Sequence, residues 1–556
     1  MDDLWEKHRP LLDDAYRAWR TRDHWSAFPE SPSPRVWGES AAAAGLTAFE
    51  AYRGEAFALD TPGADGWVAP EQPPTGIEWD IRYPHLTSDG APLLVSASQA
   101  ALPAWRDAGP HRRAGLVVEI LHRLAERSFE LAHAVMHTTG QGFVMAFQAG
   151  AAHALDRALE AVAVAVHEMT VVPPEAEWVK PAGRDRFQRL HKRYHIVPRG
   201  IGLVIGCTTF PTWNGFPGLF ASLVCGNPVI VKPHPHAVLP LAIAVRIARQ
   251  TLAEHGFDPN LVTLAVEADG EGLARVLATQ TDVRIIDYTG SSAFGAWLEE
   301  NARHAVVYAE KSAVNCALLE STDNFTGMTA NLAYSLALYS GQMCTTPRVF
   351  LVPAGGIATD VGKRGVDDIV AALRTALADL TAEPKRAAAL LGAIVDGRVA
   401  ARVEEAMHRE DVAIPSRRLE HPDFPAALVR TPVVLRTRFD ADDAYRAEWF
   451  GPIAFIVETP SPEVSLTLWE DITQHSGGLT ASVYSTDPAF LRQAEEIATR
   501  TGVLTALNFT ADTYVNQTAA FSDFHGSAAN RAATAAMTDP AFVTHRFHIA
   551  EIRQPR

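Results

Sequence analysis

The side chain most able to do chemistry is the thiol of Cys344, within the stretch SGQMCTTPR at 340–348. The pattern before it, 325–339, predicts a helix, and the apolar run 349–352 predicts a strand. Cys344 is therefore expected on a tight connection, where Gly341 permits close backbone approach and small polar neighbours leave the sulfur accessible. A cysteine so placed is a candidate nucleophile if its thiolate is favoured. The alternative interpretation is a buried structural cysteine.

A nucleophile needs partners, and the pattern between 200 and 310 predicts where they lie. Short apolar runs alternate there with helical segments such as 239–255 and 273–279. Alternating units of this length are typical of a parallel, doubly wound α/β sheet, in which ligands bind beyond the carboxyl ends of the strands. The predicted strands are 202–205, 229–231, 261–266, 283–286 and 305–308.

Polar and flexible residues follow each of these runs. They include hydroxyl and cationic groups, two glycine turns and a carboxylate, which the predicted topology brings to one edge of the sheet. The carboxylate is Glu310, which taken alone is interpreted as a solvated group at the end of a strand. The segments concerned are 208–211, 232–234, 270–272, 289–291 and 310–311.

Length, charge and cysteine content narrow the class of protein. The chain has 556 residues, 47% of them hydrophobic, and its length predicts about three or four structural units. The net charge of -16 argues against a nucleic-acid or anionic-membrane surface. The sequence contains no apolar run long enough for a transmembrane helix, and its acidic start lacks a signal core. The four cysteines form neither a disulfide framework nor a zinc pattern, so we expect a cytoplasmic protein.

The segments outside the predicted sheet are more varied. Seven of the 12 tryptophans lie in the first 105 residues, so the proline-rich leader, 1–90, is expected to form an irregular layer packed on the main body. The region 98–170 is predicted to be helical with a break at 139–142, and 175–195 to form an exposed hairpin or arm. After Cys344 a second α/β unit is expected, with helices over 365–410, strands around 428–460, and a strand, a helix and a strand over 480–508. Beyond 509 the chain is loop-rich, and the run 542–549 is expected to add to a sheet edge of this or another subunit.

Several motifs, taken together and in order, resemble the aldehyde dehydrogenase superfamily over about residues 95–530. Glu310 and Cys344 are 34 residues apart, which matches the spacing of base and nucleophile in that family. The leader, with 28–34 and 210–214, resembles the PaaN-type branch, which is linked to phenylacetate degradation. The motifs are FP (210–211), GNPVIVKP (226–233), YTGS (288–291), Glu310, GQMC (341–344) and EWFGP (448–452).

The resemblance implies an α/β, aldehyde dehydrogenase-like fold and a homodimer or homotetramer acting on a small-molecule aldehyde. The arm and the C-terminal run are the implied contacts between subunits. The implied units are a Trp/Pro-rich extension (1–94), a Rossmann-type NAD(P)-binding domain (95–310, arm about 175–195), an α/β catalytic domain (311–525) and an oligomerisation or tail segment (526–556).

The implied chemistry begins at Cys344. Its thiolate attacks an aldehyde to give a thiohemiacetal, whose oxyanion is held by the Cys344 backbone N–H and one side chain. Loss of a hydride to a nicotinamide gives a thioester, and Glu310 activates the water that hydrolyses it. A base of this kind benefits from a raised pKa in a partly apolar pocket, and we expect the pKa of Glu310 to be raised.

The resemblance also implies a set of cofactor-binding residues. Lys232 would bind the cofactor ribose, although a snorkelling surface lysine is the alternative. Ser291 would meet the pyrophosphate from a helix N-terminus, Glu448 would hold the nicotinamide ribose, and Phe450 would pack against the ring. The full set is Lys232, Pro233, His234, Gly270, Gly290, Ser291, Glu448 and Phe450.

Two departures from the family pattern bear on catalysis. Thr209 stands where the family's oxyanion asparagine precedes Phe-Pro, and Asn214 follows five residues later, so either side chain is a candidate donor. The glycine pair usual after the catalytic glutamate is absent, so the loop after Glu310 is expected to differ. In this respect the chain resembles the aldehyde dehydrogenase domain of bifunctional phenylacetate ring-cleavage proteins.

A third departure concerns the cofactor. Pro235, flanked by His234 and His236, replaces a glutamate that often binds the adenosine 2′-hydroxyl in the family. A 2′-phosphate is then tolerated, and Lys232 with the histidines would attract it. We therefore predict NADP over NAD as the cofactor. We predict no metal site at the two histidines, because a third ligand is lacking.

Three functions are compatible with these residues. The first is an NADP-linked aldehyde dehydrogenase that makes a free acid from a semialdehyde of aromatic or phenylacetate catabolism, or from its CoA thioester. The second is a CoA-acylating dehydrogenase, against which Glu310 argues because acylating relatives usually lack that base. The third is a catalytically silent binding protein with the same fold.

Overall fold

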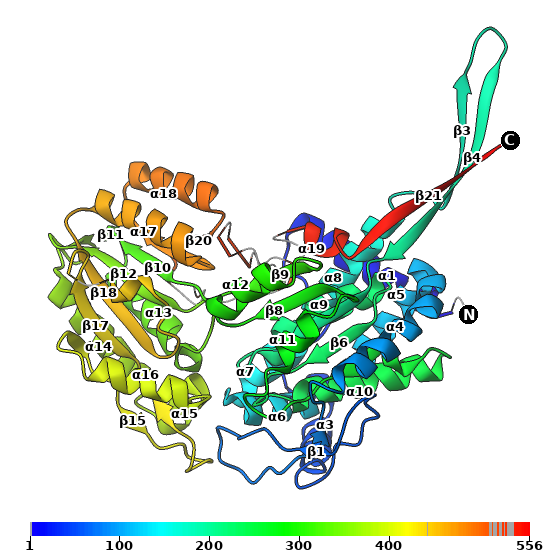
Figure 1. Cartoon of the computed structure of the whole chain (residues 1–556). Coiled ribbons are helices and arrows are strands. Elements are labelled where there is room, and N and C mark those ends of the chain that lie inside the picture. The colour runs from blue at the N-terminus through cyan, green and yellow to red at the C-terminus, as the bar shows by residue number, and fades with distance from the viewer. Residues whose placement is uncertain are drawn as a thin grey trace.

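Two lobes, each built around a largely parallel sheet, make up the body of the molecule (Figure 1). The computed structural model describes residues 3–441, 443–510, 514, 520–521, 525–527, 529–530 and 539–556. Within these residues, no helix is long and apolar enough to cross a membrane. The predicted α/β fold class is confirmed. The loop-rich segment predicted beyond 509 lies largely outside the described residues.

The first sheet is made of the five strands that the sequence predicted, and all of its neighbours pair in parallel. Its strands are mostly buried, as expected of a sheet covered by helices. The strand order reverses between β5 and β8, and ligands bind at the carboxyl ends of strands beside such a switch point. In spatial order the strands are β7 (Val262–Leu264), β6 (Val229–Lys232), β5 (Ile201–Ile205), β8 (Val283–Thr289) and β9 (Val306–Glu310).

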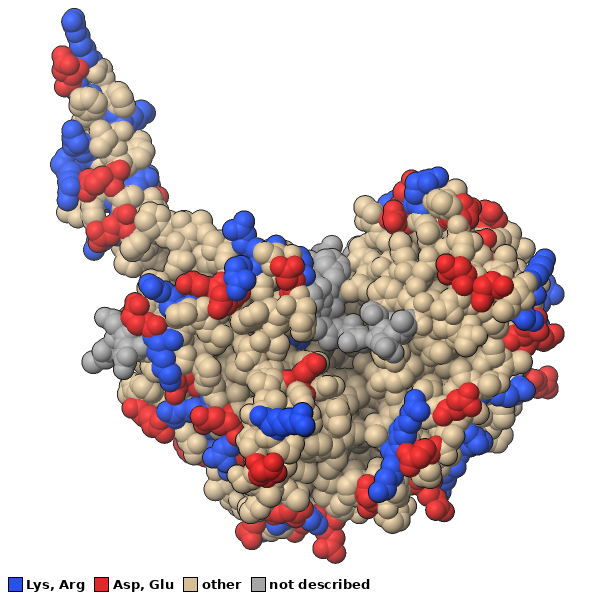
Figure 2. Space-filling model, turned by 180° about the vertical axis from the view of Figure 1, so that it is seen from behind, with Lys and Arg blue, Asp and Glu red and all other residues tan. Residues whose placement is uncertain are grey.

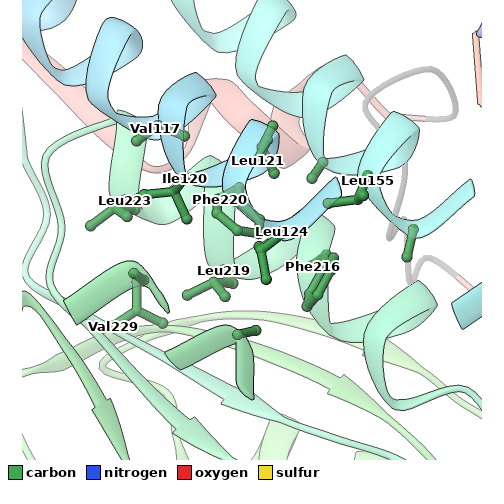
Figure 3. Close-up of a cluster of buried hydrophobic side chains, with 14 of the residues drawn as sticks. Val117, Ile120, Leu121, Leu124, Leu155, Phe216, Leu219, Phe220, Leu223 and Val229 are labelled. Carbon is green, nitrogen blue, oxygen red and sulfur yellow. The ribbon is translucent and has the colours of Figure 1, made fainter. Parts of the chain in front are cut away.

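A helical layer packs on this sheet and forms the largest core. Ile120 and Leu124, one turn apart on α5, lie against Phe220 of α9 above the sheet (Figure 3). Full burial of each such side chain contributes about 1.5–3 kcal/mol. The predicted break at 139–142 is confirmed, because α6 ends at Thr139 and the residue after it, Gly140, takes a left-handed φ of 78°. The helices of this lobe are α4 (Ala91–Asp107), α5 (Gly109–Ala125), α6 (Ser128–Thr139), α7 (Phe143–Phe147), α8 (His153–Thr170), α9 (Pro211–Val224), α10 (Leu239–Glu254), α11 (Leu273–Ala278) and α12 (Ser292–Asn301).

The leader is more regular than the sequence suggested. It contains a 19-residue helix, α1 (Asp3–Thr21), whose Leu12, Ala15 and Ala18 are buried in the same core as α5 and α8. The apolar side chains of α1 recur at helical spacing, and this pattern outweighs its internal proline. The prediction of an irregular layer is therefore wrong here, whereas packing on the main body is confirmed. The other leader elements are α2 (Pro34–Trp37), α3 (Ala41–Glu50), β1 (Trp67–Val68) and β2 (Tyr83–Pro84).

The second lobe contains a seven-stranded sheet in which all pairs but β14–β17 are parallel. The predicted second α/β unit, with its helices over 365–410 and its strand, helix and strand over 480–508, is confirmed. In spatial order the strands are β14 (Val412–Ile414), β17 (Val433–Arg438), β18 (Ile453–Thr459), β12 (Pro347–Pro353), β10 (Asn315–Leu319), β19 (Thr480–Tyr484) and β20 (Leu504–Leu507). The helices are α13 (Phe325–Ala337), α14 (Val366–Leu380), α15 (Pro384–Leu391), α16 (Gly397–Met407), α17 (Pro462–Ser476) and α18 (Pro488–Thr501). Two small strand pairs are β11 (Ser321–Thr322) with β13 (Ala358–Thr359), and β15 (Arg418–Leu419) with β16 (Val429–Arg430).

A three-stranded arm projects from the first lobe, as predicted for 175–195 (Figure 1). Its strands are β3 (Glu175–Pro181), β4 (Phe187–Pro198) and β21 (Phe547–Pro555), all antiparallel. Basic and acidic side chains lie close together along it (Figure 2). The predicted run 542–549 is divided between α19 (Ala541–Thr544) and β21, and β21 pairs with β4 of its own chain. The run therefore adds to a sheet edge of its own chain, and β21 is itself an edge strand of the arm.

Candidate active site

Cys344 lies on a turn between α13 and β12, as the sequence predicted. A 3-10 turn, Leu338–Gly341, precedes it, and Tyr339 and Ser340 there take left-handed φ angles of 51° and 49°. Such angles cost roughly 1–3 kcal/mol at a residue with a side chain and persist only where the surroundings impose them. The turn that presents the thiol is therefore held in shape by its neighbours.

Arg348 fastens this turn to the loop 448–452. Its guanidinium donates to two carbonyls of the turn, at 2.9 and 3.0 Å, and to two carbonyls of the loop, at 3.1 and 2.8 Å. The two backbones also approach closely, since a Cβ at Gly341 would lie 2.5 Å from the Gly451 carbonyl oxygen. The close approach predicted for Gly341 is thus confirmed, and the nucleophile and the loop are positioned together.

Asn315 fixes the other side of the turn. Its Nδ2 donates to the carbonyls of Cys344 (2.7 Å) and Thr346 (2.9 Å). Its Oδ1 accepts from the backbone N–H groups of Leu479 (2.9 Å) and Thr480 (3.0 Å). Neither Asn315 nor Arg348 was predicted from the sequence as part of the site. The available signal was a polar residue adjoining an apolar strand, because such a group is buried only with partners.

Glu310 is the last residue of β9 and is 1% exposed. Asn214 donates from Nδ2 to Glu310 Oε2 at 3.3 Å. Asn214 lies one turn inside α9, which begins at Pro211, and helical side chains lean back toward the N-terminus of their helix. The amide therefore reaches the end of β9, in contact with the candidate base.

His525, which was not predicted from the sequence, completes this cluster. Its Nε2 lies 3.0 Å from Glu310 Oε1 and 3.7 Å from Cys344 Sγ. The ring is 1% exposed and meets Trp213 edge-on, with 4.9 Å between ring centroids. A lone histidine in a loop-rich segment carries no pattern that would single it out. The donor atoms of Glu310, Cys344 and His525 lie within 4.8 Å of one another, a spacing that could hold a metal ion.

Two opposite pKa shifts characterise the cluster. Burial acts to raise the pKa of Glu310, but the charge and hydrogen bond of His525, a hydrogen bond from Cys344 and the charge of Arg157 lower it overall. The expectation of a raised pKa for Glu310 is therefore wrong, because its partners outweigh its burial. Burial raises the pKa of the Cys344 thiol well above its usual range, and the Glu310 carboxylate adds to this shift. The resting thiol is protonated, with an ionised acceptor beside it.

The second oxyanion candidate, Thr209, lies nearby but has other contacts. Its carbonyl accepts from Gln141 Nε2 at 2.8 Å. Burial raises the pKa of the Cys207 thiol to about 11, and hydrogen bonds from the Phe210 backbone and from Thr209 oppose that shift. Cys207 in turn lies 3.6 Å from Asn214 Oδ1. Asn214 therefore contacts the catalytic cluster through Glu310, while Thr209 contacts Cys207.

A cavity of about 300 Å³ opens at the carboxyl ends of β5, β8 and β9 and reaches Cys344; most of its lining residues are polar, so it is called the polar cavity. Eight predicted site residues line it: Thr209, Asn214, Gly290, Ser291, Glu310, Cys344, Glu448 and Phe450. Ser291 caps the ten-residue helix α12, and its Oγ accepts from the Phe294 backbone N–H at 3.3 Å. The loop after Glu310 is held by Asn530, which accepts from the Lys311 N–H (3.0 Å) and donates to its carbonyl (2.8 Å).

Four predicted residues, Lys232, Pro233, His234 and Gly270, do not line this cavity. Lys232 is 4% exposed at the end of β6 and forms an ion pair with Glu267. Glu267 also accepts from the Leu273 backbone N–H at 2.6 Å. Lys232 is therefore buried and paired, and it is not a snorkelling surface lysine. Burial lowers the pKa of His234 to about 3, so its ring is neutral and offers no charge to a phosphate.

A second, larger cavity of about 500 Å³ reaches Cys344 from the other side. The leader contributes Glu30, which accepts from His153 at 2.7 Å. The leader segment before it is tied to α8 by Asp156, which accepts from Ser26 Oγ (2.5 Å) and the Ala27 N–H (2.9 Å). The lining is mainly apolar and aromatic, with residues such as Val144, Met145, Ala149, Phe210, Trp213, Tyr334, Leu338, Met343, Leu390 and Tyr514. Arg386 also lines this cavity and brings a permanent positive charge to it.

Comparison with known proteins gives a consistent picture. The family model described as "Aldehyde dehydrogenase family" matches residues 71–540. The crystal structure of an NAD-dependent aldehyde dehydrogenase from Burkholderia multivorans is 49% identical, covers 100% of this chain and 99% of its own, and superposes with a TM-score of 0.96. An N-succinylglutamate 5-semialdehyde dehydrogenase from Chromobacterium violaceum is 26% identical over 68% of this chain and 73% of its own length. The structure of a Thermus 1-pyrroline-5-carboxylate dehydrogenase with bound NAD shares the fold at 17% identity and a TM-score of 0.74, covering 96% of this chain and 99% of its own.

Proposed function

The chain belongs to the aldehyde dehydrogenase family and is an oxidoreductase that acts on aldehydes. From that premise we propose that it converts a semialdehyde with a bulky, largely apolar body into a free carboxylic acid. The observation that carries this proposal is the Glu310–Cys344 cluster, placed where a polar and an apolar cavity meet. In the proposed mechanism Cys344 is the nucleophile and Glu310 is the base.

The first half of the reaction acylates Cys344. The thiol proton passes to Glu310, the sulfur bonds to the aldehyde carbon, and the carbonyl oxygen becomes an oxyanion. The Cys344 backbone N–H and Asn214 Nδ2 are the proposed oxyanion donors. Asn214 is preferred to Thr209 because its amide already lies 3.3 Å from Glu310, beside the nucleophile.

The second half releases the acid. A bound nicotinamide would accept the hydride that leaves the tetrahedral adduct. Glu310, after the thiol proton has left for solvent, takes a proton from water as that water attacks the thioester carbon. The carbon–sulfur bond then breaks, and the proton returns to Cys344. Aldehyde, oxidised cofactor and water thus give acid, reduced cofactor and one proton.

The residues of the polar cavity fit a nicotinamide dinucleotide. The N-terminus of α12, capped by Ser291, opens on this cavity and suits a pyrophosphate. Glu448 lies farther along and suits ribose hydroxyl groups, with Phe450 beside it. Lys232 and Glu267, outside this cavity, are proposed to meet the adenosine end of the cofactor.

The preference for NADP over NAD stays a prediction. Its support is Pro235, which leaves no carboxylate at the position from which the family often excludes a 2′-phosphate. Two observations weigh against an attraction of the 2′-phosphate by these side chains: His234 is neutral, and Lys232 is already paired with Glu267. Both cofactors therefore belong in the first assay.

The large apolar cavity supports a substrate with a bulky apolar or aromatic body. Its volume is about 500 Å³, and aromatic rings, among them stacked Tyr334 and Tyr514, line it. These features suit a semialdehyde from aromatic catabolism, and the resemblance to the PaaN-type branch suggests phenylacetate degradation. Arg386 at the same cavity suits an anionic group such as the phosphates of a CoA thioester.

The proposal includes a homo-oligomer of cytoplasmic subunits. The arm exposes large apolar side chains, among them Trp178, Phe187 and Ile552, which are 37%, 56% and 45% exposed. We propose that these side chains pack against another subunit. All four cysteines are free, which suits a reducing compartment.

An absorbance assay at the NAD(P)H band tests this function. Purified protein would be given NAD or NADP with aliphatic, aromatic and CoA-linked aldehydes, with and without free CoA, and the product would be identified by mass spectrometry. We expect the highest kcat/KM with a bulky apolar aldehyde, and a free acid even when CoA is present. An acyl-CoA product would indicate the acylating reaction, and no reduction with any aldehyde would indicate a silent binding protein.

A further inference from the structure

The contacts of His525 assign chemistry to a residue outside every motif of the family resemblance. One atom, Nε2, lies 3.0 Å from Glu310 Oε1 and 3.7 Å from Cys344 Sγ. The base and the nucleophile therefore share one imidazole nitrogen.

We propose that His525 is a third catalytic residue. Its Nε2–H lies between the Glu310 carboxylate and the Cys344 sulfur, and its hydrogen bond shifts from the carboxylate to the sulfur as the thiol loses its proton. This inference rests on the proposed roles of Cys344 and Glu310. It adds a thiolate donor that those roles lack.

The cluster of Glu310, Cys344 and His525 has two protonation states in this proposal. At rest, Nε2–H donates to the ionised Glu310, and the Cys344 thiol donates to the same carboxylate. When the thiol proton passes to Glu310, that oxygen loses its charge and the sulfur gains one. Nε2–H then donates to the thiolate, which holds the new charge at the sulfur until it attacks the aldehyde. No proton is gained or lost in this exchange.

The ring is held where this exchange requires it. Trp213 meets His525 edge-on, and the Arg157 guanidinium carbon lies 3.7 Å from the centre of the Trp213 ring. Trp213 belongs to α9 and Arg157 to α8, so two buried helices of the first lobe back the ring.

The charged and titratable groups around the cluster come from several elements. Arg157 of α8 acts on Glu310, while Cys207, after β5, and Glu448, in the loop after β17, act on Cys344. The negative groups among these oppose a thiolate, as does burial, which raises the pKa of Cys344. An N–H donor at the sulfur opposes both effects, because a hydrogen bond to the charged form favours that form.

Alkylation of Cys344 tests the inference without aldehyde or cofactor. The rate of iodoacetamide labelling would be measured against pH for two proteins that both carry Cys207→Ser, one with His525 and one with His525→Phe. EDTA would be present to exclude metal. Phenylalanine keeps a ring against Trp213 but removes the N–H. We expect the midpoint of the alkylation profile to move up by about one pH unit, and the rate at pH 7 to fall about tenfold.

Two further variants separate chemistry from packing. His525→Gln keeps an N–H donor and should recover part of the lost rate. His525→Ala should be rescued by added imidazole, which can occupy the vacated space. The matched control is His475→Phe on α17, an exposed histidine outside both cavities, which should leave the profile unchanged.

The outcomes are decisive in both directions. If the phenylalanine and wild-type midpoints coincide, or if imidazole fails to rescue the alanine variant, His525 only packs. Should the phenylalanine variant not fold, the glutamine variant and the alanine variant with imidazole give the same test. Because no aldehyde is used, a protein that oxidised none would still answer the question about His525. Failure of the proposed function and failure of this inference are thus distinguishable.

Discussion

Two cavities meet at Cys344, and they are built in different ways. About half of the residues that line the polar cavity, about 300 Å³, lie at or directly after the ends of strands of the first sheet. The second lobe adds the start of α16 and the loop before β18. The apolar cavity, about 500 Å³, is lined by helices from both lobes and by Glu30 of the leader. Much of the first lining follows from sheet topology, whereas the second lining comes from helices and segments that no sheet edge brings together.

This difference explains what the two cavities can do. A sheet edge places its polar groups at fixed offsets after each strand, so it suits a ligand that is the same throughout a family. Helix faces and added segments vary freely, so they suit the part of the substrate that differs between relatives. We therefore expect substitutions on the polar side to change the use of cofactor, and those on the apolar side to change the choice of aldehyde.

The largest effect is expected from a substitution of Cys344, the residue at which the two cavities meet. Cys344→Ser should lower kcat/KM by about 10³-fold or more, because a hydroxyl is a far weaker nucleophile than a thiolate. Steady-state NAD(P)H formation measures this effect. Cys207→Ser, which changes another thiol in the polar cavity, is the control and should keep most of the activity. Equal losses in both variants would mean that Cys344 is not the nucleophile.

Glu310→Gln should separate the two halves of the reaction. Without a base for water, steady-state turnover should fall about 10²- to 10⁴-fold after one equivalent of NAD(P)H has formed in a burst. The burst itself should be slower than in the wild type, because the Cys344 thiol has also lost its proton acceptor. Rapid-mixing absorbance measures both phases. Unchanged turnover would remove Glu310 from its proposed role.

The pKa shifts give a pH prediction for the wild type. The pKa of Glu310 is lowered, so this base is present above its usual value near 4.5 and is lost only as pH falls below that value. The pKa of Cys344 is raised, so the thiolate increases as pH rises through neutrality. The burst rate should therefore rise with pH from 6 to 9, while thioester hydrolysis should stay nearly constant over that range. A burst rate independent of pH would contradict this assignment.

The same contrast between the cavities explains how far the sequence could predict the structure. The five strands of the first sheet, the position of Glu310 and the turn at Cys344 follow from local patterns and from offsets along the chain. His525 and Glu30 could not be predicted in this way, because nothing in their neighbourhoods indicates contact with residues hundreds of positions away. The direction of the pKa shift of Glu310 was mispredicted for the same reason, because it depends on the contacts of Glu310 with His525 and on the charge of Arg157.

A smaller effect is expected at the far end of the cofactor side. Lys232→Met should raise the cofactor KM by about 10- to 100-fold and leave the aldehyde KM unchanged. It should also lower the free energy of unfolding by about 3–5 kcal/mol, because it leaves Glu267 buried without its cation. Cofactor titration and urea unfolding measure the two quantities.

The double variant Lys232→Met with Glu267→Leu separates binding from stability. Replacing both charges with apolar groups should recover most of the free energy of unfolding but not the cofactor KM. If the cofactor KM recovers together with stability, Lys232 is a structural residue and does not bind the cofactor.

The smallest effect lies at the leader, where the apolar cavity opens. Glu30 is 54% exposed at its side chain and pairs with His153, so its charge acts through solvent and is worth only about 0.2–1 kcal/mol. Glu30→Gln should therefore lower the KM for a CoA-linked, anionic aldehyde by about two- to fivefold, because a like charge is removed from the cavity that also holds Arg386. The KM values for a neutral aromatic aldehyde and for the cofactor should not change. Glu6→Gln, an exposed leader residue outside both cavities, is the matched control. An equal change for neutral and anionic aldehydes, or any change in the cofactor KM, would show that the leader supports the fold without forming part of the substrate side.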